Sequence, residues 1–242
     1  MKLIKKYLFG GQNAQAVSAA RAYNLWSEAY DQQPGNLMLD LDEQIFSKLV
    51  EAVPIAGKEV LDVGCGTGRH WNKLLAHHPS NLTGFDVSEG MLARLKDKFP
   101  LACTVLMECE SHLNAKNNSS DTLISTLTIA HIKNLPAVIT EWCRVLKPEA
   151  DIIITDFHPE ALAFGARRTF RHNSKTIVVD NYVYPLEKIK ELLFSKGFMV
   201  KSEEIRIVDQ SVQHYYSEKN ALSLYERFYG IPVIYGIHLS RP

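Results

Sequence analysis

Hydrophobic residues in the middle of the chain alternate between the spacing of a β-strand and that of an α-helix. The apolar run at 59–63 is typical of a short strand, and helical spacing follows over 69–78. The same alternation predicts four further strands, at 82–86, 101–107, 122–127 and 151–156. Strands that alternate with helices indicate a parallel sheet with right-handed crossovers.

Capping residues define the ends of two predicted helices. Ser88 is the predicted N-cap of a helix that ends before Pro100. Asn134 is the predicted N-cap of a helix over 135–146. The strand at 151–156 is apolar enough to be buried on both faces, as the inner strands of such sheets are.

The rhythm changes after Asp156. The segment 157–184 contains a predicted hairpin around 172–175 and is predicted to be inserted at the carboxyl edge of the fifth strand. The remaining predicted elements are a helix at 185–196, a strand at 198–208, an amphipathic stretch at 222–228, a strand at 233–239 and, ahead of the sheet, a helix at 12–30. We therefore expect an N-terminal helical lid at 1–41 and a main domain at 42–242.

Composition narrows the classes of function. The 242 residues are 46% hydrophobic and 22% charged, which suits one large core and excludes a disulfide-stapled miniprotein or a disordered tail. Lys and Arg together number 27, as do Asp and Glu, so net charge does not favour nucleic acid or an anionic membrane. No apolar run approaches the roughly 20 residues of a membrane span. We expect a cytoplasmic protein with a small partner, without membrane or nucleic-acid binding.

The four cysteines, at 65, 103, 109 and 143, have neither CxxC nor metal-ligand spacing, and the histidines form no ligand set. We predict no metal.

A strand that breaks into alternating glycines at Gly64, Gly66 and Gly68 carries the sharpest signal of chemistry. Glycine lets the backbone turn tightly and lets a ligand approach the start of the following helix. The dinucleotide fingerprint needs its third glycine where Arg69 stands. Asp62 would also lie near a pyrophosphate, and like charges repel strongly where water is excluded. A cationic ligand group removes this conflict.

S-adenosylmethionine has such groups, an ammonium and a sulfonium, and its ribose needs a hydrogen-bond acceptor. Asp86 closes the second predicted strand and can accept from both ribose hydroxyls. The two carboxylates, Asp62 and Asp86, are then explained by one ligand.

On these residues the chain resembles the class I S-adenosylmethionine-dependent methyltransferases. The first motif of that family is echoed by 60–68 and its second by 84–88, and a common subgroup is similar at 121–132 and 144–148. The resemblance implies an α/β fold, a doubly wound, mostly parallel seven-stranded sheet with strand order 3-2-1-4-5-7-6 and the last strand antiparallel. It is close over about 60–156, loose over 22–31 and weak from His158 onward.

The resemblance also implies a set of site residues. The methionyl part is expected near Asp62, Gly64 and Gly66, the ribose on Asp86, and the adenine beside Val87, Met91 and Glu108. The full set of predicted cofactor-binding residues is Tyr23, Tyr30, Asp62, Gly64, Cys65, Gly66, Gly68, Asp86, Val87, Met91, Glu108, Cys109 and Thr126.

The predicted acceptor side is mainly aromatic. The candidate substrate-binding residues are Trp26, Phe157, Tyr182 and Tyr184. Tyr23, Trp26 and Tyr30 fit either a buried helix face or a lid over the methionine tail. The basic cluster at 167–175 fits either a solvated hairpin or a device that attracts an anionic acceptor.

His131 and His158 are the candidate catalytic bases, because imidazole titrates near neutral pH and both residues follow strands at the expected site. Packing or helix capping is the alternative role for His131. The predicted reaction is an in-line transfer of the methyl group to a small-molecule acceptor, with S-adenosylhomocysteine as product. A regulator that binds S-adenosylmethionine without turnover and an RNA methyltransferase stay open. A nicotinamide dehydrogenase is disfavoured by Asp62 and Arg69.

Overall fold

A seven-stranded sheet forms the centre of the computed structural model, which describes residues 16–107, 112–173 and 175–242. Its strands, in spatial order, are β4 (Cys103–Leu106), β3 (Asn81–Asp86), β2 (Glu59–Val63), β5 (Ser120–Thr126), β6 (Leu146–Phe157), β10 (Pro232–Arg241) and β9 (Met199–Ile207). Only β10 runs antiparallel to its neighbours within this sheet. The predicted strand order, with an antiparallel last strand, is confirmed.

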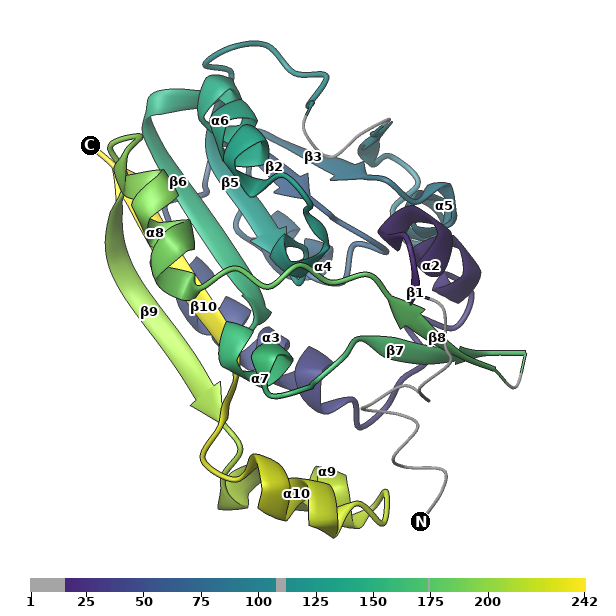
Figure 1. Cartoon of the computed structure of the whole chain (residues 1–242). Helices are drawn as coiled ribbons and strands as arrows, with labels where there is room; N and C mark the ends of the chain where they lie inside the picture. Colours follow the sequence, from purple (N-terminus) through teal and green to yellow (C-terminus); the bar gives the residue numbers. More distant parts are fainter. Residues whose placement is uncertain (1–15, 108–111, 174) are drawn as a thin grey trace.

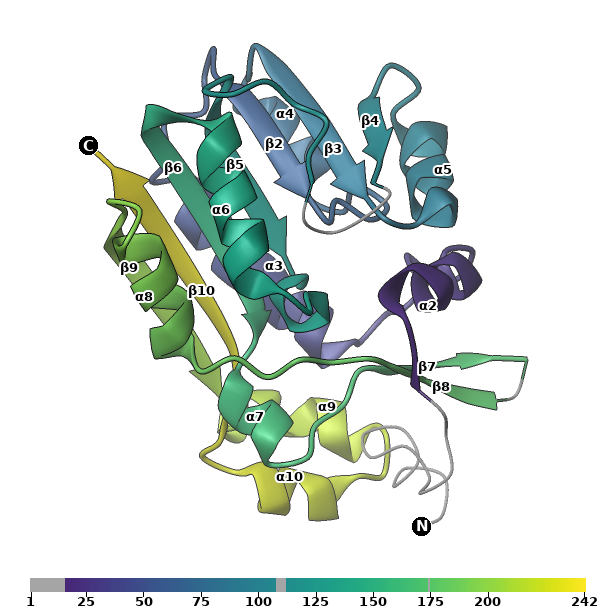
Figure 2. The ribbon, with the colours of Figure 1, turned by 45° about the horizontal axis from the view of Figure 1, so that its top comes forward.

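Helices cover both faces of this sheet (Figures 1 and 2). On one face, α3 (Leu37–Val50), α4 (Trp71–Ala76) and α5 (Glu89–Lys98) contribute to one hydrophobic core. On the other face, α6 (Leu135–Val145) and α8 (Leu186–Phe194) contribute to a second core. Both predicted N-caps are confirmed, because Ser88 accepts from the amide of Met91 and Asn134 accepts from that of Ala137.

Helix α3 was not predicted from the sequence. Asn36 caps it by accepting from the backbone amides of Met38 and Leu39. Its residues Leu41 and Ile45 lie in the core under the sheet. The boundary predicted between residues 41 and 42 therefore falls inside a helix that packs with the main domain.

A smaller sheet and α2 (Ala19–Trp26) lie beside the carboxyl ends of the central strands (Figure 2). The smaller sheet has the order β1 (Ala16–Val17), β8 (Lys175–Val179), β7 (Thr169–His172). The predicted hairpin is confirmed, because β7 and β8 pair antiparallel. We call α2 and this smaller sheet the cap.

The predicted extent of the first helix, 12–30, was wrong. Residues 16–17 form β1 and pair parallel with 178–179, while 27–31 form turns and 12–15 lie outside the described residues. Pairing with a strand far along the chain satisfies the backbone of 16–17, and local helical spacing contains no information about such a partner.

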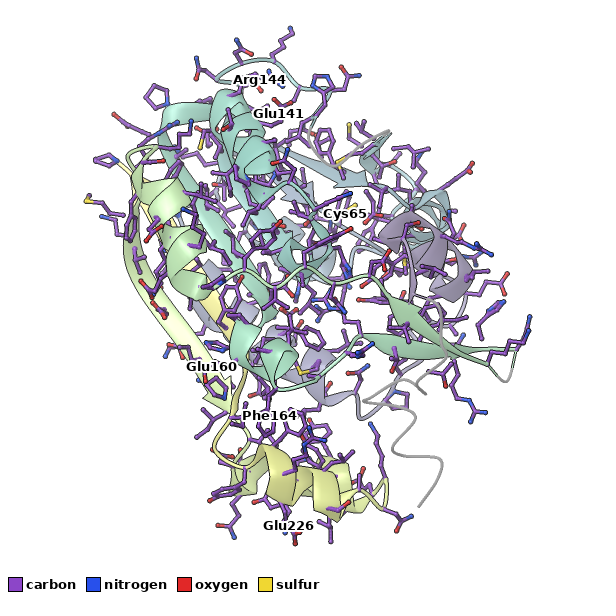
Figure 3. The ribbon with its side chains drawn as sticks, in the orientation of Figure 1. Cys65, Glu141, Arg144, Glu160, Phe164 and Glu226 are labelled. Atoms are coloured by element: carbon purple, nitrogen blue, oxygen red, sulfur yellow. The ribbon has the colours of Figure 1, made fainter. Side chains whose placement is uncertain are left out.

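The remaining segments are short. They are η1 (Ile129–His131), α7 (Pro159–Ala163), η2 (Gln210–Val212), α9 (Gln213–Ser217) and α10 (Leu222–Phe228). Phe164 follows α7 and contacts Phe228 of α10 edge to face, with ring centroids 5.2 Å apart (Figure 3). Among the helices in the described part of the chain, none is both long and apolar enough to cross a bilayer.

Candidate functional site

A cleft of about 670 Å³, partly open to solvent, lies at the carboxyl ends of the central strands. Its lining residues are Ala19, Tyr23, Tyr30, Val63, Gly64, Gly66, Asp86, Val87, Met91, Met107, Thr126, Leu127, Thr128, His131, Ile132 and Val138. A smaller cavity of about 320 Å³ shares five of these residues and adds Asp62, Cys65, Thr67, Arg69 and His70. Ligand sites in open α/β sheets form at this edge.

Most predicted cofactor-binding residues meet here. The two cavities are lined by Tyr23, Tyr30, Asp62, Gly64, Cys65, Gly66, Asp86, Val87, Met91 and Thr126. Gly68 lines neither, and Glu108 and Cys109 lie outside the described residues. Sequence reasoning missed Met107, Ile132 and Val138, which add apolar wall. Met107 directly follows β4, so the rule that sites form at strand ends could have identified it.

Gly64 and Gly66 of the glycine loop have positive φ values, which residues with a side chain rarely adopt. Gly64 has φ +78°, and a Cβ there would lie 2.1 Å from the hydroxyl oxygen of Thr128. Gly66 has φ +53°, yet a Cβ there would meet no atom within 4 Å. The space beside Gly66 therefore belongs to the cavity, and a ligand can approach the backbone directly.

Asp62 lies at the end of β2 and is 4% exposed. Its Oδ2 accepts from the indole nitrogen of Trp71 at 2.9 Å, whereas its Oδ1 is buried without a hydrogen-bond partner. Burial raises the pKa of Asp62 to about 6. A buried carboxylate oxygen that lacks a donor, and belongs to a cavity wall, suits a ligand that brings its own donor or positive charge.

Asp86 ends β3 and holds the loop that it faces. Its Oδ2 accepts from the amide of Gly66 and its Oδ1 from the amide of Ser88, both at 2.8 Å. Burial raises the pKa of Asp86 to about 6, against the effect of these amides. Each oxygen keeps a second lone pair, so Asp86 can still accept from two ligand hydroxyls.

Cys65 lies in the loop that follows β2 (Figure 3). It is 7% exposed, and burial raises the pKa of its thiol well above the usual value. A protonated, buried thiol is a poor nucleophile, so the side chain acts here as a small apolar wall.

His131 lines the larger cavity, and both of its ring nitrogens have protein partners. Nδ1 lies 3.0 Å from the carbonyl oxygen of Asp180, and Nε2 lies 2.6 Å from Nη1 of Arg168 and 2.9 Å from the hydroxyl of Tyr23. Burial first and Arg168 second lower the pKa of His131 to about 3. In this geometry the imidazole does not act as a base near neutral pH.

His158 does not line the cleft or the smaller cavity. It is the N-cap of α7, where its Nδ1 accepts from the amide of Glu160 at 3.3 Å, and its ring contacts that of Tyr235. Burial lowers the pKa of His158. Capping explains this side chain without a role in catalysis.

The predicted substrate-binding residues also lie outside the lining of these two cavities. Trp26 stacks on Phe170 with ring centroids 4.6 Å apart, and Phe157 lies under the guanidinium of Arg168 at 4.3 Å. Tyr184 donates to the carbonyl oxygen of Lys133 at 2.7 Å, and the backbone amide of Tyr182 donates to the carbonyl oxygen of Ala130. Their assignment to the acceptor stays a prediction.

The N-terminal segment is tied to the cofactor-side loops. Oδ1 of Asn24 accepts from the hydroxyl of Ser88 at 2.7 Å and from the amide of Gly90 at 2.9 Å. Asp31 accepts from the hydroxyl of Thr67 at 2.6 Å and from Lys98 at 2.8 Å. These bonds hold α2 and the turn after it over the cleft.

Comparison with known proteins agrees with this geometry. Residues 61–154 match the family model described as a methyltransferase domain. The part of the chain at 61–154, which contains the glycine loop, is therefore a methyltransferase domain of the kind that this model describes. A chain in the solved complex of the Trm112 methyltransferase activator with a methyltransferase from Haloferax volcanii has the same fold. The TM-score is 0.68 at 16% identity, and the match covers 93% of this chain and 98% of that one.

Two curated relatives of the methyltransferase domain have named roles. The biotin biosynthesis bifunctional protein BioHC of Saccharophagus degradans is 26% identical over 69% of this chain and 32% of its own length. The malonyl-[acyl-carrier protein] O-methyltransferase of Halorhodospira halophila is 27% identical over 59% of this chain and 48% of its own. The chain thus spans less than half of either relative.

Proposed function

We propose that the chain binds S-adenosylmethionine in the two joined cavities and transfers its methyl group to a small-molecule acceptor. The buried, unpartnered Oδ1 of Asp62, a residue that lines the smaller cavity beside the glycine loop, is the observation that carries this proposal. A dinucleotide would bring phosphates toward this carboxylate, whereas an ammonium supplies the missing donor.

The residues present suit each part of the cofactor. Asp62 and the loop at 64–67 would hold the methionyl end, and Asp86 would accept from the ribose hydroxyls. Val87, Met91 and Met107 would pack against the adenine. When bound, the cofactor supplies a methyl group on positively charged sulfur; an electron pair of the acceptor forms the new bond, and the C–S pair stays on sulfur.

The protein contributes alignment and exclusion of water. Tyr23 and Tyr30 reach the larger cavity from the N-terminal segment, and burial raises the pKa of Tyr30 to about 12. Both phenols therefore stay protonated near neutral pH and serve as walls and hydrogen-bond donors. We assign the lid role to the cap and to the turn at 27–31, together with the segment 157–184.

The malonyl-carrier relative indicates a carboxylate on a carrier arm as one candidate class. The absence of metal or nucleic-acid partners and a cytoplasmic location stay predictions from the sequence.

Ligand-induced stabilisation tests the cofactor assignment. S-adenosylmethionine and S-adenosylhomocysteine should raise the melting temperature as their concentrations exceed the dissociation constant, and NAD should leave it unchanged. A larger shift with NAD would overturn the proposal.

Transfer itself is measured with methyl-labelled S-adenosylmethionine and a panel that contains malonyl-acyl carrier protein, small carboxylic acids, amines and RNA. Labelled product from a small acceptor supports methyl transfer. Tight cofactor binding without product across the panel would instead indicate a regulatory protein, and labelled RNA would move the acceptor to that class.

A further inference from the structure

Arg168 is a buried cation at the junction of the cap and the central sheet. Its side chain is 5% exposed, whereas its neighbour Arg167 is exposed. Arg168 forms an ion pair with Asp156, donates to the carbonyl oxygen of Leu127 and lies over the ring of Phe157. One residue of the inserted segment thereby contacts the carboxyl ends of both β5 and β6.

The same guanidinium reaches the wall of the larger cavity. Nη1 of Arg168 lies 2.6 Å from Nε2 of His131 and 3.4 Å from the hydroxyl oxygen of Tyr23. His131 and Tyr23 both line the larger cavity, but Arg168 does not. The side chains through which Arg168 meets this wall are therefore those of His131 and Tyr23.

The hydrogen-bond partners determine the tautomer of His131. The carbonyl oxygen of Asp180 can only accept, so Nδ1 carries the proton and Nε2 has one lone pair. Two donors face that lone pair, Arg168 at 2.6 Å and Tyr23 at 2.9 Å. A guanidinium has no lone pair and must donate, whereas a hydroxyl can rotate and donate elsewhere. The shorter, charge-assisted bond from Arg168 takes the lone pair.

We propose that Arg168 is a positioning residue for methyl transfer: it occupies the basic nitrogen of His131 and leaves the Tyr23 hydroxyl free to donate into the acceptor site. This inference rests on the proposed function. It changes the role of His131 from a base to a fixed, neutral part of the wall. The acceptor then has to arrive with its reacting electron pair already free.

This arrangement favours a carboxylate as the acceptor. A carboxylate can accept from Tyr23 with one oxygen and use the other oxygen to attack, and no proton has to leave. A donor aimed at an amine would instead occupy the single lone pair that must react. The charged and titratable groups around His131 are Arg168, Asp156 and Tyr23, with the peptide of Asp180, and none of them supplies a free base.

Nuclear magnetic resonance of the histidine rings tests the first half of the proposal without any acceptor. In the full chain with bound S-adenosylhomocysteine, His131 should stay in the neutral Nδ1–H form from pH 5 to 8. A titration extended down to pH 3 locates the midpoint of His131, which should rise by about one pH unit or more in Arg168→Met, because the positive charge is gone. Arg168→Lys should restore part of the suppression, and Arg167→Met should match the wild type.

A wild-type His131 that titrates near its usual pKa, or an unchanged midpoint in Arg168→Met, would overturn the proposal. If Arg168→Met does not fold, Arg168→Lys and Tyr23→Phe decide the matter. Tyr23→Phe should keep the neutral His131 tautomer. If S-adenosylhomocysteine does not bind, the proposed function fails, and the same titration on the free protein still tests the Arg168–His131 contact.

Turnover tests the second half. With malonyl-acyl carrier protein or another carboxylate that the panel identifies, Tyr23→Phe should lower kcat at least tenfold. The loss in kcat should exceed any loss of affinity for S-adenosylhomocysteine. An amine as the best acceptor, or full activity in Tyr23→Phe, would overturn the donor role of Tyr23.

Discussion

Two buried carboxylates face the proposed cofactor, and their ionisation opposes the stability of the ligand-free protein. Burial raises the pKa of Asp62 and that of Asp86 to about 6. When folding raises the pKa of a carboxyl, its ionisation lowers the free energy of unfolding, and this loss is complete above about pH 6. The two negative charges therefore reduce the stability of the ligand-free protein, as expected of groups that are placed to bind a ligand.

Asp62→Asn should separate stability from binding. At pH 8 the variant should gain about 1–3 kcal/mol of unfolding free energy without ligand, and less at pH 5, because the buried negative charge is gone. Urea unfolding measures this gain. The stabilisation by S-adenosylmethionine should shrink in parallel. A variant that binds the cofactor as tightly as the wild type would disprove the role of Asp62.

Asp86→Ala should weaken binding of S-adenosylhomocysteine by roughly 1–3 kcal/mol, because ribose hydroxyls lose their acceptor. Calorimetry measures the affinity. The amides of Gly66 and Ser88 also lose their acceptor, so Asp86→Asn, which keeps one oxygen, is the matched control. Unchanged affinity in both variants would show that Asp86 is misassigned.

At the scale of elements, α2 depends on contacts with α5 more than on its own capping. Ser18 precedes α2 and makes no side-chain cap, whereas Asn24 in the middle of the helix accepts from the hydroxyl of Ser88 and the amide of Gly90. The helix is short, and an isolated helix of this length is marginal in water. Its position over the cleft is therefore a tertiary property.

Asn24→Ala should loosen α2 while the central sheet stays intact. Each lost hydrogen bond contributes about 1 kcal/mol, so the dissociation constant of S-adenosylhomocysteine should rise roughly fivefold or more. Hydrogen exchange should increase in α2 and not in β5. Arg21→Ala, an exposed change in the same helix, is the control. Equal effects of the two variants would argue against the contact.

At the scale of the whole molecule, the pH dependence of cofactor affinity follows from opposing titrations. Below about pH 6, Asp62 and Asp86 take up protons in the free protein, and an ammonium ligand must displace the proton of Asp62. His131 stays neutral on both sides of this range. Protonation of Asp62 and Asp86 is therefore expected to couple to binding between pH 5 and 7.

Affinity for S-adenosylhomocysteine should accordingly fall as pH drops below 6, by up to about tenfold per pH unit for each carboxylate that must ionise. Calorimetry in buffers of different ionisation enthalpy measures the protons released. Asp62→Asn should flatten the profile. A wild-type affinity that is constant from pH 5 to 7 would contradict the predicted coupling.

Sequence patterns identified the domain correctly because the methyltransferase signal is local. The strand–loop–helix at 59–76 and the next strand place Asp62 and Asp86 through short βα units whose geometry any parallel sheet repeats. Helix α3 was missed although Asn36 is an ordinary N-cap, since no strand pattern adjoined it. His158 was assigned to catalysis, and its capping of α7 was not predicted. Pro159 and Glu160 signal a helix start and could have identified His158 as the N-cap.

The residue pattern by itself predicted a parallel sheet of alternating strands and helices and placed the two carboxylates at strand ends, since alternating periods and right-handed crossovers allow few arrangements. The order of the seven strands came from the resemblance to the methyltransferase family. Tertiary structure alone decided the state of His131. Its two donors, Tyr23 and Arg168, lie 108 and 37 positions away in the chain. No local pattern encodes such a meeting, and the competition of these donors for one nitrogen determines which group can accept or donate a proton at the site.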